Sequence, residues 1–256
     1  MSAPPPARRA LAPVFFRWHR WLGWIVGLQV LAWLAGGLMF TWLPFKSWVK
    51  AEDLVRKPAL QLSEGWASAL ATQAQALGPA PVLGLSAVAT ARGPALRVRR
   101  GDGDAWLALD GRPFAAPDAD AVAHFARSLY KGSEVPLAVT RIAGAPPVRA
   151  LIVRETAGRG DLWLASFDDA LGTRLYFDAR GGELVAVRND AWVLYDFFWR
   201  LHLMDYGEGE DFSHPLVKAA SLLAFSLVVT GAVLSLLAGR RALRQRSRRR
   251  LARPAG

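Results

Sequence analysis

WLGWIVGLQVLAWLAGGLMFTWLP, residues Trp21–Pro44, contains no charged side chain. A helix rises about 1.5 Å per residue, so this stretch is long enough to cross a hydrocarbon core of about 30 Å. A second apolar stretch, Pro215–Ala238, carries a single charge, Lys218, close to its start. The sequence therefore predicts two transmembrane helices, separated by about 170 residues.

The basic residues are concentrated in the two tails. Residues 1–20 contain four Arg and residues 240–256 contain eight, with no acid in either tail. The whole chain carries a net charge of +11, so residues 21–239 sum to −1. Cationic residues beside a membrane span hold that end in the cytoplasm and attract anionic lipid headgroups. This distribution argues against nucleic-acid binding.

The same charges predict the topology of a bacterial inner-membrane protein. Both tails, 1–20 and 239–256, are expected in the cytoplasm, and residues 45–214 in the periplasm. Some basic residues also follow the first span and reduce the asymmetry, but the eight Arg of the C-terminal tail outweigh them; they are Lys46, Lys50, Arg56 and Lys57.

The first span is interpreted as a retained anchor rather than a cleaved signal peptide. It is longer than a usual signal h-region, and PFKSWVKAED (44–53) after it contains no A-x-A cleavage site. Residues 1–13 are Pro-rich and basic, and we expect them to be disordered. The chain has no Cys, which excludes disulfides, thiolate metal ligands and cysteine nucleophiles.

The region between the spans is predicted to contain two rounds of a helix followed by antiparallel strands, over residues 58–117 and 118–190. The helices are expected at Ser63–Leu77, capped by Ser63, and at Asp118–Tyr130, capped by Asp118 or Asp120. Strands are expected between turn signals, and apolar residues roughly alternate in Leu96–Arg100 and Ala105–Leu109. The expected strands are Val82–Ala91, Ala95–Arg100, Ala105–Asp110, Leu137–Ile142, Arg149–Glu155, Asp161–Phe167, Arg174–Asp178 and Glu183–Arg188. Ala179–Gly182 is expected to form the last hairpin turn.

An aromatic segment follows the second round. Residues 192–199 contain five aromatic side chains in eight positions. We expect residues 192–206 to form a short helix in the outer membrane interface, where amphipathic rings prefer to lie.

Small residues mark one face of the first span. Gly23 and Gly27 form a GxxxG pair, and Gly37 falls on about the same helical face. Small residues on one face let another helix approach closely. Two partners for this face stay open: the second span of the same chain, or a second copy in a homodimer.

Four segments resemble the PepSY-associated transmembrane family: RWHRWLGWIVGL (17–28), RLYFDARGGELVAVRND (174–190), WVLYDFFWRLHLMDYGEGEDFSHPL (192–216) and TGAVLSLL (230–237). The resemblance implies an α+β membrane protein in which two transmembrane helices flank a periplasmic tandem of PepSY-like modules. Each module would place a helix against an antiparallel sheet. The family hairpin often reads D-x-x-T-G-E, and here Gly181 replaces Thr within residues 178–183.

The resemblance implies two different functions. Larger relatives with four spans include ferric-siderophore reductases, in which histidines of the spans hold b-type haem. Smaller PepSY proteins resemble binding or regulatory modules. A membrane accessory protein would bind a membrane or periplasmic protein partner, in iron uptake or a membrane redox system; the alternative is a haem b electron carrier.

The histidines bear on the haem alternative. His19 lies at the cytoplasmic boundary, whereas His202 and His214 lie near the outer one. A bis-histidine haem needs both ligands at similar depth, so His19, about 30 Å away, cannot share a haem with either. His202 with His214, or a matched pair across a dimer, can do so. His124 is expected at the surface or core edge of its helix.

Two other interpretations of the outer histidines stay open. One is an imidazole hydrogen-bonded to a headgroup or neighbour. The other is a site for iron or a divalent cation, which imidazole and carboxylate ligands can hold; its candidate ligands are His202, Asp205, Glu208, Glu210, Asp211 and His214.

The sequence contains none of the common catalytic motifs: no H-E-x-x-H, no G-x-S-x-G, no P-loop and no G-x-G-x-x-G after a predicted strand. A hydrolase or a dehydrogenase is therefore not expected. The sequence favours a non-enzymatic protein.

Overall fold

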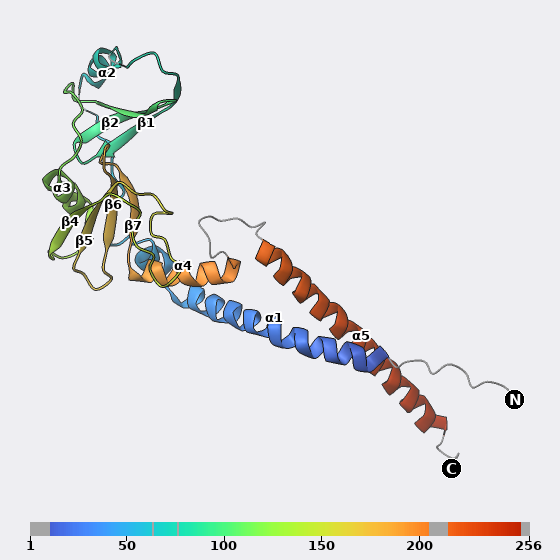
Figure 1. Cartoon of the computed structure of the whole chain (residues 1–256). Helices are drawn as coiled ribbons and strands as arrows, with labels where there is room; N and C mark the ends of the chain where they lie inside the picture. Colours follow the sequence, from blue (N-terminus) through green and yellow to red (C-terminus); the bar gives the residue numbers. More distant parts are fainter. Residues whose placement is uncertain (1–10, 63, 76, 205–214, 252–256) are drawn as a thin grey trace. The chain divides into compact units, whose positions relative to one another are not determined.

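A computed structural model describes residues 11–62, 64–75, 77–204 and 215–251 of the chain (Figure 1). The chain forms two compact units. The helical unit contains residues 11–37, 201–204 and 215–251, and the sheet unit contains residues 38–200.

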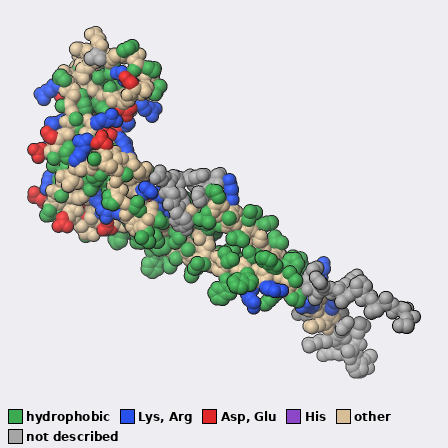
Figure 2. All heavy atoms as spheres, viewed as in Figure 1, with side chains coloured by type: hydrophobic (Ala, Val, Ile, Leu, Met, Phe, Trp, Pro, Cys, Tyr) green, Lys and Arg blue, Asp and Glu red, His purple; other side chains and the backbone are tan. Residues whose placement is uncertain are grey.

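The helical unit is built from two long helices, α1 (Leu11–Trp42) and α5 (Pro215–Leu251). Each contains a segment long and apolar enough to cross a membrane, Pro13–Trp42 and Pro215–Gln245. Hydrophobic side chains cover the visible face of both helices (Figure 2).

Both helices extend beyond the spans that hydropathy indicates. The helix α1 starts at Leu11, so residues 11–13 are helical rather than disordered; residues 1–10 lie outside the described part of the chain. The helix α5 continues through the Arg-rich tail to Leu251. Arg, Ala and Leu are strong helix formers, and one Gly, Gly239, costs only about 1 kcal/mol in a long helix.

The sheet unit starts with a short π-helix, η1 (Phe45–Val49), and then forms a first module. Its sheet has the antiparallel order β1-β2-β3, with the strands at Val82–Thr90, Gly93–Arg100 and Gly103–Ala108. Its helix α2 (Trp66–Ala74) is shorter than predicted because Gly65, at φ 80°, starts it in a left-handed conformation. The predicted cap Ser63 lies outside the described residues.

The second module contains α3 (Ala119–Leu129) and an antiparallel sheet of order β4-β5-β6-β7. The strands are Leu137–Ile142, Leu162–Phe167, Arg174–Asp178 and Leu184–Arg188. The predicted cap is confirmed, because the Asp118 carboxylate accepts a hydrogen bond from the Ala121 N–H at 2.8 Å. Apolar side chains of α3 pack on Phe167, Leu175 and Phe177 of the sheet.

The prediction of a strand at Arg149–Glu155 is wrong. The backbone turns back on itself there, with two 2.8 Å hydrogen bonds between Arg149 and Val153. Ala150 and Leu151 adopt positive φ angles of 44° and 70°, which a strand does not contain. The turn exposes Leu151 and directs Glu155 into the interior.

The two modules meet at the hairpin between β6 and β7. The Ala91 N–H donates to the Gly182 carbonyl at 3.0 Å, and the Arg97 guanidinium pairs with Glu183 at 2.5 Å. The indole of Trp106 occupies the space where a Cβ at Gly181 would lie. This contact accounts for Gly at the position where the family hairpin often has Thr.

The helix α4 (Asp190–Leu203) follows β7 and continues into the helical unit at Leu201. It starts earlier than the predicted 192–206 because the Asn189 side chain accepts a hydrogen bond from the Trp192 N–H at 2.7 Å and caps the helix. Within the sheet unit, the ring centroid of Tyr195 lies 4.9 Å from that of Phe40 and 5.1 Å from that of Phe45.

Candidate functional site

A cleft of about 440 Å³ runs along the outer edge of β7. β7 is the last strand in the sheet order. A bridge between Thr90 of β1 and Glu183 covers the start of its outer edge, and no other described strand pairs with the rest of that edge. All five residues of β7, 184–188, line the cleft. Because successive side chains of a strand point to opposite faces, the cleft must follow the strand edge rather than one face.

The opposite wall of the cleft is the segment 49–58, which we call the wall segment. It is fixed to the second module by its backbone: the Arg56 N–H donates to the Leu129 carbonyl, and the Lys131 N–H donates to the Leu54 carbonyl, both at 2.7 Å. Ala51 and Val55 are buried in the module core. The cleft is therefore already formed in the absence of a ligand.

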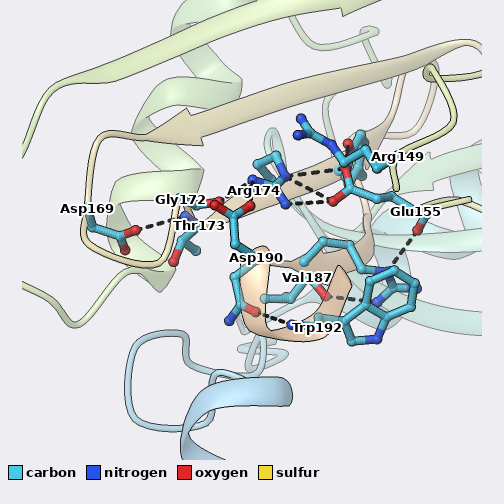
Figure 3. Close-up of polar contacts among 12 residues, drawn as sticks. Arg149, Glu155, Asp169, Gly172, Thr173, Arg174, Val187, Asp190 and Trp192 are labelled. Atoms are coloured by element: carbon cyan, nitrogen blue, oxygen red, sulfur yellow. Dashed lines mark hydrogen bonds and ion pairs between the residues drawn. The ribbon is translucent and has the colours of Figure 1, made fainter. Parts of the chain in front are cut away.

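A buried ion network supports the end of β7 (Figure 3). The Glu155 carboxylate, 1% exposed, accepts hydrogen bonds from the Arg174 guanidinium at 2.7 Å and from the Tyr176 hydroxyl at 2.5 Å. Burial of the phenol and its bond to Glu155 raise the pKa of Tyr176. Burial alone would lower the pKa of Arg174, but the carboxylates of Glu155 and Asp190 together outweigh burial and raise that pKa.

Arg188 links this network to the cleft. Its Nε donates to the Glu155 carbonyl at 2.8 Å, and its guanidinium lies 4.0 Å above the ring of Trp192. Burial lowers the pKa of Arg188. The Asn189 amide donates to the Trp48 carbonyl at 2.6 Å, which joins the start of α4 to η1. The network thus positions the cleft walls. Its polar groups form hydrogen bonds and ion pairs with one another.

The cleft is strongly basic. Lys50, Arg56 and Lys57 line it and are exposed, and among the described residues none of them forms an ion pair. Glu52 is the only acidic side chain in the lining that the structure describes. In the sequence, these cations bear only on the membrane topology. The cleft forms because the wall segment lies beside β7, and these two segments are far apart in the sequence.

A second cleft of about 430 Å³ in the same module includes Tyr130 and Asp169. The Asp169 carboxylate accepts bonds from the Thr173 N–H at 2.8 Å and from the Tyr130 hydroxyl at 2.9 Å. Burial and this carboxylate raise the pKa of Tyr130 to about 12. These groups satisfy one another, so we assign them a structural role.

The family model described as the PepSY-associated TM region matches residues 16–254, which include α5, all but the first turn of α1, and the whole sheet unit. The chain belongs to the PepSY-associated TM family. It is a membrane protein, and the predicted α+β fold with two transmembrane helices flanking antiparallel sheets is confirmed. Comparison with curated proteins and with solved structures gave no match.

His19 of this PepSY-associated TM protein lies where α1 meets α5. Its Nδ1 is 3.0 Å from the Thr230 hydroxyl. The imidazole packs against Gly231 so closely that a Cβ there would lie 3.1 Å from the ring. In the described structure, His19 thus contributes to helix pairing.

His202 lies beside Trp33 of α1, with ring centroids 5.3 Å apart, and its carbonyl accepts the Trp33 indole N–H at 2.9 Å. His19 precedes Trp33 by 14 residues on the same helix, a separation of about 21 Å along the axis. This separation is too large for the two histidines of one chain to ligate one haem. His124 is exposed on α3.

The cavity at His202 measures about 210 Å³, below the roughly 300 Å³ at which small-molecule sites begin. The remaining predicted ligands, Asp205, Glu208, Glu210, Asp211 and His214, lie outside the described residues. Within the described part of the chain, no cluster of three His, Asp or Glu could hold a metal ion.

The glycines of α1 differ in their surroundings. A Cβ at Gly23 would lie 4.0 Å from Leu227 of α5, whereas a Cβ at Gly27 or Gly37 would have nothing within 4 Å. Gly23 therefore faces the second span. The homodimer through Gly23, Gly27 and Gly37 stays a prediction.

The absence of native Cys allows a direct test of this helix pairing. We expect Gly23→Cys combined with Leu227→Cys to cross-link within one chain in native membranes, seen as a mobility shift after mild oxidation. Gly27→Cys with Leu227→Cys should cross-link much less. An intermolecular product from Gly27→Cys alone would support the homodimer, and equal cross-linking of both pairs would contradict the helix pairing.

Proposed function

We propose that the chain is a non-enzymatic accessory protein of the bacterial inner membrane whose sheet unit binds a membrane or periplasmic protein partner. The preformed basic cleft at the open edge of β7 carries this proposal. Interaction sites commonly use exposed strand edges, because the unpaired backbone groups supply directed hydrogen bonds. The family resemblance favours a partner in iron uptake or a membrane redox system.

The proposed topology has both termini in the cytoplasm and residues 45–214 in the periplasm. The twelve Arg of the two tails support it, since the residues between them sum to −1. A periplasm-active reporter fused after Asp110 should be active, and the same reporter after Gly256 should be silent. Activity after Gly256 would refute the topology.

The second candidate function is haem b-dependent electron transfer. One observation favours it: a hydroxyl bonded to Nδ1 of His19 is the kind of contact that orients a ligating imidazole, whose other nitrogen then faces the metal. Since no second described histidine reaches His19, the partner ligand would come from a second copy.

The visible spectrum of the full chain, purified in mild detergent from haem-replete cells, separates the two functions. We expect a colourless protein that co-purifies stoichiometrically with another membrane or periplasmic component. A Soret band that sharpens with dithionite and disappears in His19→Ala, in His202→Ala or in His214→Ala would instead establish the electron carrier. Absence of a stoichiometric component would refute the accessory function.

A further inference from the structure

We infer that the cleft takes an extended, acidic segment of the partner protein, which pairs with β7 as a fifth strand of the second sheet. The inference rests on the proposed function and specifies the chemistry of its binding site. Two features of one surface support it: an edge of β7 that no described strand covers beyond the Thr90–Glu183 bridge, and cations that form no ion pair within the described residues.

The strand edge supplies the backbone contacts. In an antiparallel sheet, alternate residues of an edge strand direct both N–H and C=O away from the sheet. At one end of the strand, the Val187 carbonyl already accepts the Arg188 guanidinium at 2.8 Å. At the other end, the bridge between Thr90 and Glu183 occupies the edge just before Leu184. An incoming strand is therefore expected to pair with the middle of β7, around Val185 and Ala186.

The wall segment supplies the charge selectivity. A strand added to β7 turns every second side chain to the same face. Side chains on the face of the wall segment meet Lys50, Arg56 and Lys57, opposed only by Glu52 in the described lining. Acidic residues at alternate positions match this arrangement, and basic ones would be repelled.

The same charges disfavour a second copy of this chain as the occupant. In a two-fold dimer the identical surface contacts itself. Pairing of β7 with β7 would bring the cations of the two wall segments together, and like charges directly opposite destabilise a sheet contact. Anionic lipid headgroups could meet the cations, but they would make no use of the strand edge.

The test uses the full chain in phosphatidylcholine nanodiscs and a dye-labelled heptapeptide in which Val and Glu alternate, followed by fluorescence anisotropy. One control peptide carries Lys in place of Glu. Another keeps Glu but carries N-methyl groups on alternate backbone nitrogens, which blocks strand pairing without changing the charge. We expect only the unmodified acidic peptide to bind.

Variants of the chain locate the binding. Lys57→Glu should weaken binding of the acidic peptide about tenfold or more. Arg112→Glu makes the same change in net charge at a residue whose side chain is 86% exposed on the first module, and should have no effect. If both variants weaken peptide binding equally, the peptide is attracted only by the net charge of the protein, and the inference is overturned.

Three other results would overturn it. Equal binding of the N-methylated peptide would exclude strand addition. If no peptide binds and Lys57→Glu reduces only the association with phosphatidylglycerol vesicles, the cations bind lipid headgroups. A change from dimer to monomer in Lys57→Glu would assign the edge to a second copy. If a stoichiometric partner still co-purifies in any of these cases, the proposed function survives and only its site is wrong.

Discussion

Replacing Glu155 by Ala should destabilise the sheet unit by about 3–5 kcal/mol, because it removes the buried counter-ion of Arg174 and leaves only the exposed carboxylate of Asp190 at 2.9 Å. The Arg174 side chain is 7% exposed and directs its Nη2 and Nε to Glu155. Removal of the carboxylate also leaves the buried Tyr176 hydroxyl without its acceptor. Pulse proteolysis of the full chain in detergent, over a range of urea concentrations, measures the loss.

The control removes an ion pair at the surface. Arg92→Ala breaks the pair with Asp118, whose two side chains are 38% and 62% exposed, and should cost less than about 1 kcal/mol. Combining Glu155→Leu with Arg174→Met should restore part of the lost stability, because no buried charge is then left alone. Equal losses in Glu155→Ala and Arg92→Ala would show that the network does not support the module.

Replacing Gly181 by Thr should separate the two modules or destabilise them by about 1–3 kcal/mol, the usual cost of overpacking. A Cβ at this position would overlap the Trp106 indole of the first module. Thr is the residue that the family hairpin often carries, so the substitution tests whether Trp106 is the reason for its absence.

A double-mutant cycle measures this coupling. Trp106→Ala alone should also destabilise the junction, because it removes the indole from beneath Arg97 and Arg180, which lie 5.9 and 5.7 Å from the ring. Thr at position 181 should then cost much less in the Trp106→Ala background than in the native chain, since residues in contact do not act additively. Additive losses would refute the contact.

Local sequence predicted those elements whose formation depends on nearby residues. Apolar length identified the two spans, and apolar runs between turn signals located β4 and β6 at their observed bounds. Asp118 was one of two candidate caps, recognisable because a capping side chain bonds to the next turn of its own helix. By contrast, the same kind of apolar run predicted a strand at Arg149–Glu155, where the chain instead turns to place Glu155 against Arg174.

The sequence by itself determined that this chain is a membrane protein of α+β class, because hydrophobic length, tail charge and period-two alternation are properties of contiguous residues. Only the tertiary structure decided where the basic cleft lies and why position 181 is Gly. Lys57 reaches the edge of β7, and Trp106 reaches the hairpin, across many intervening residues. Such contacts depend on how separate elements pack, and packing leaves no periodic signal along the chain.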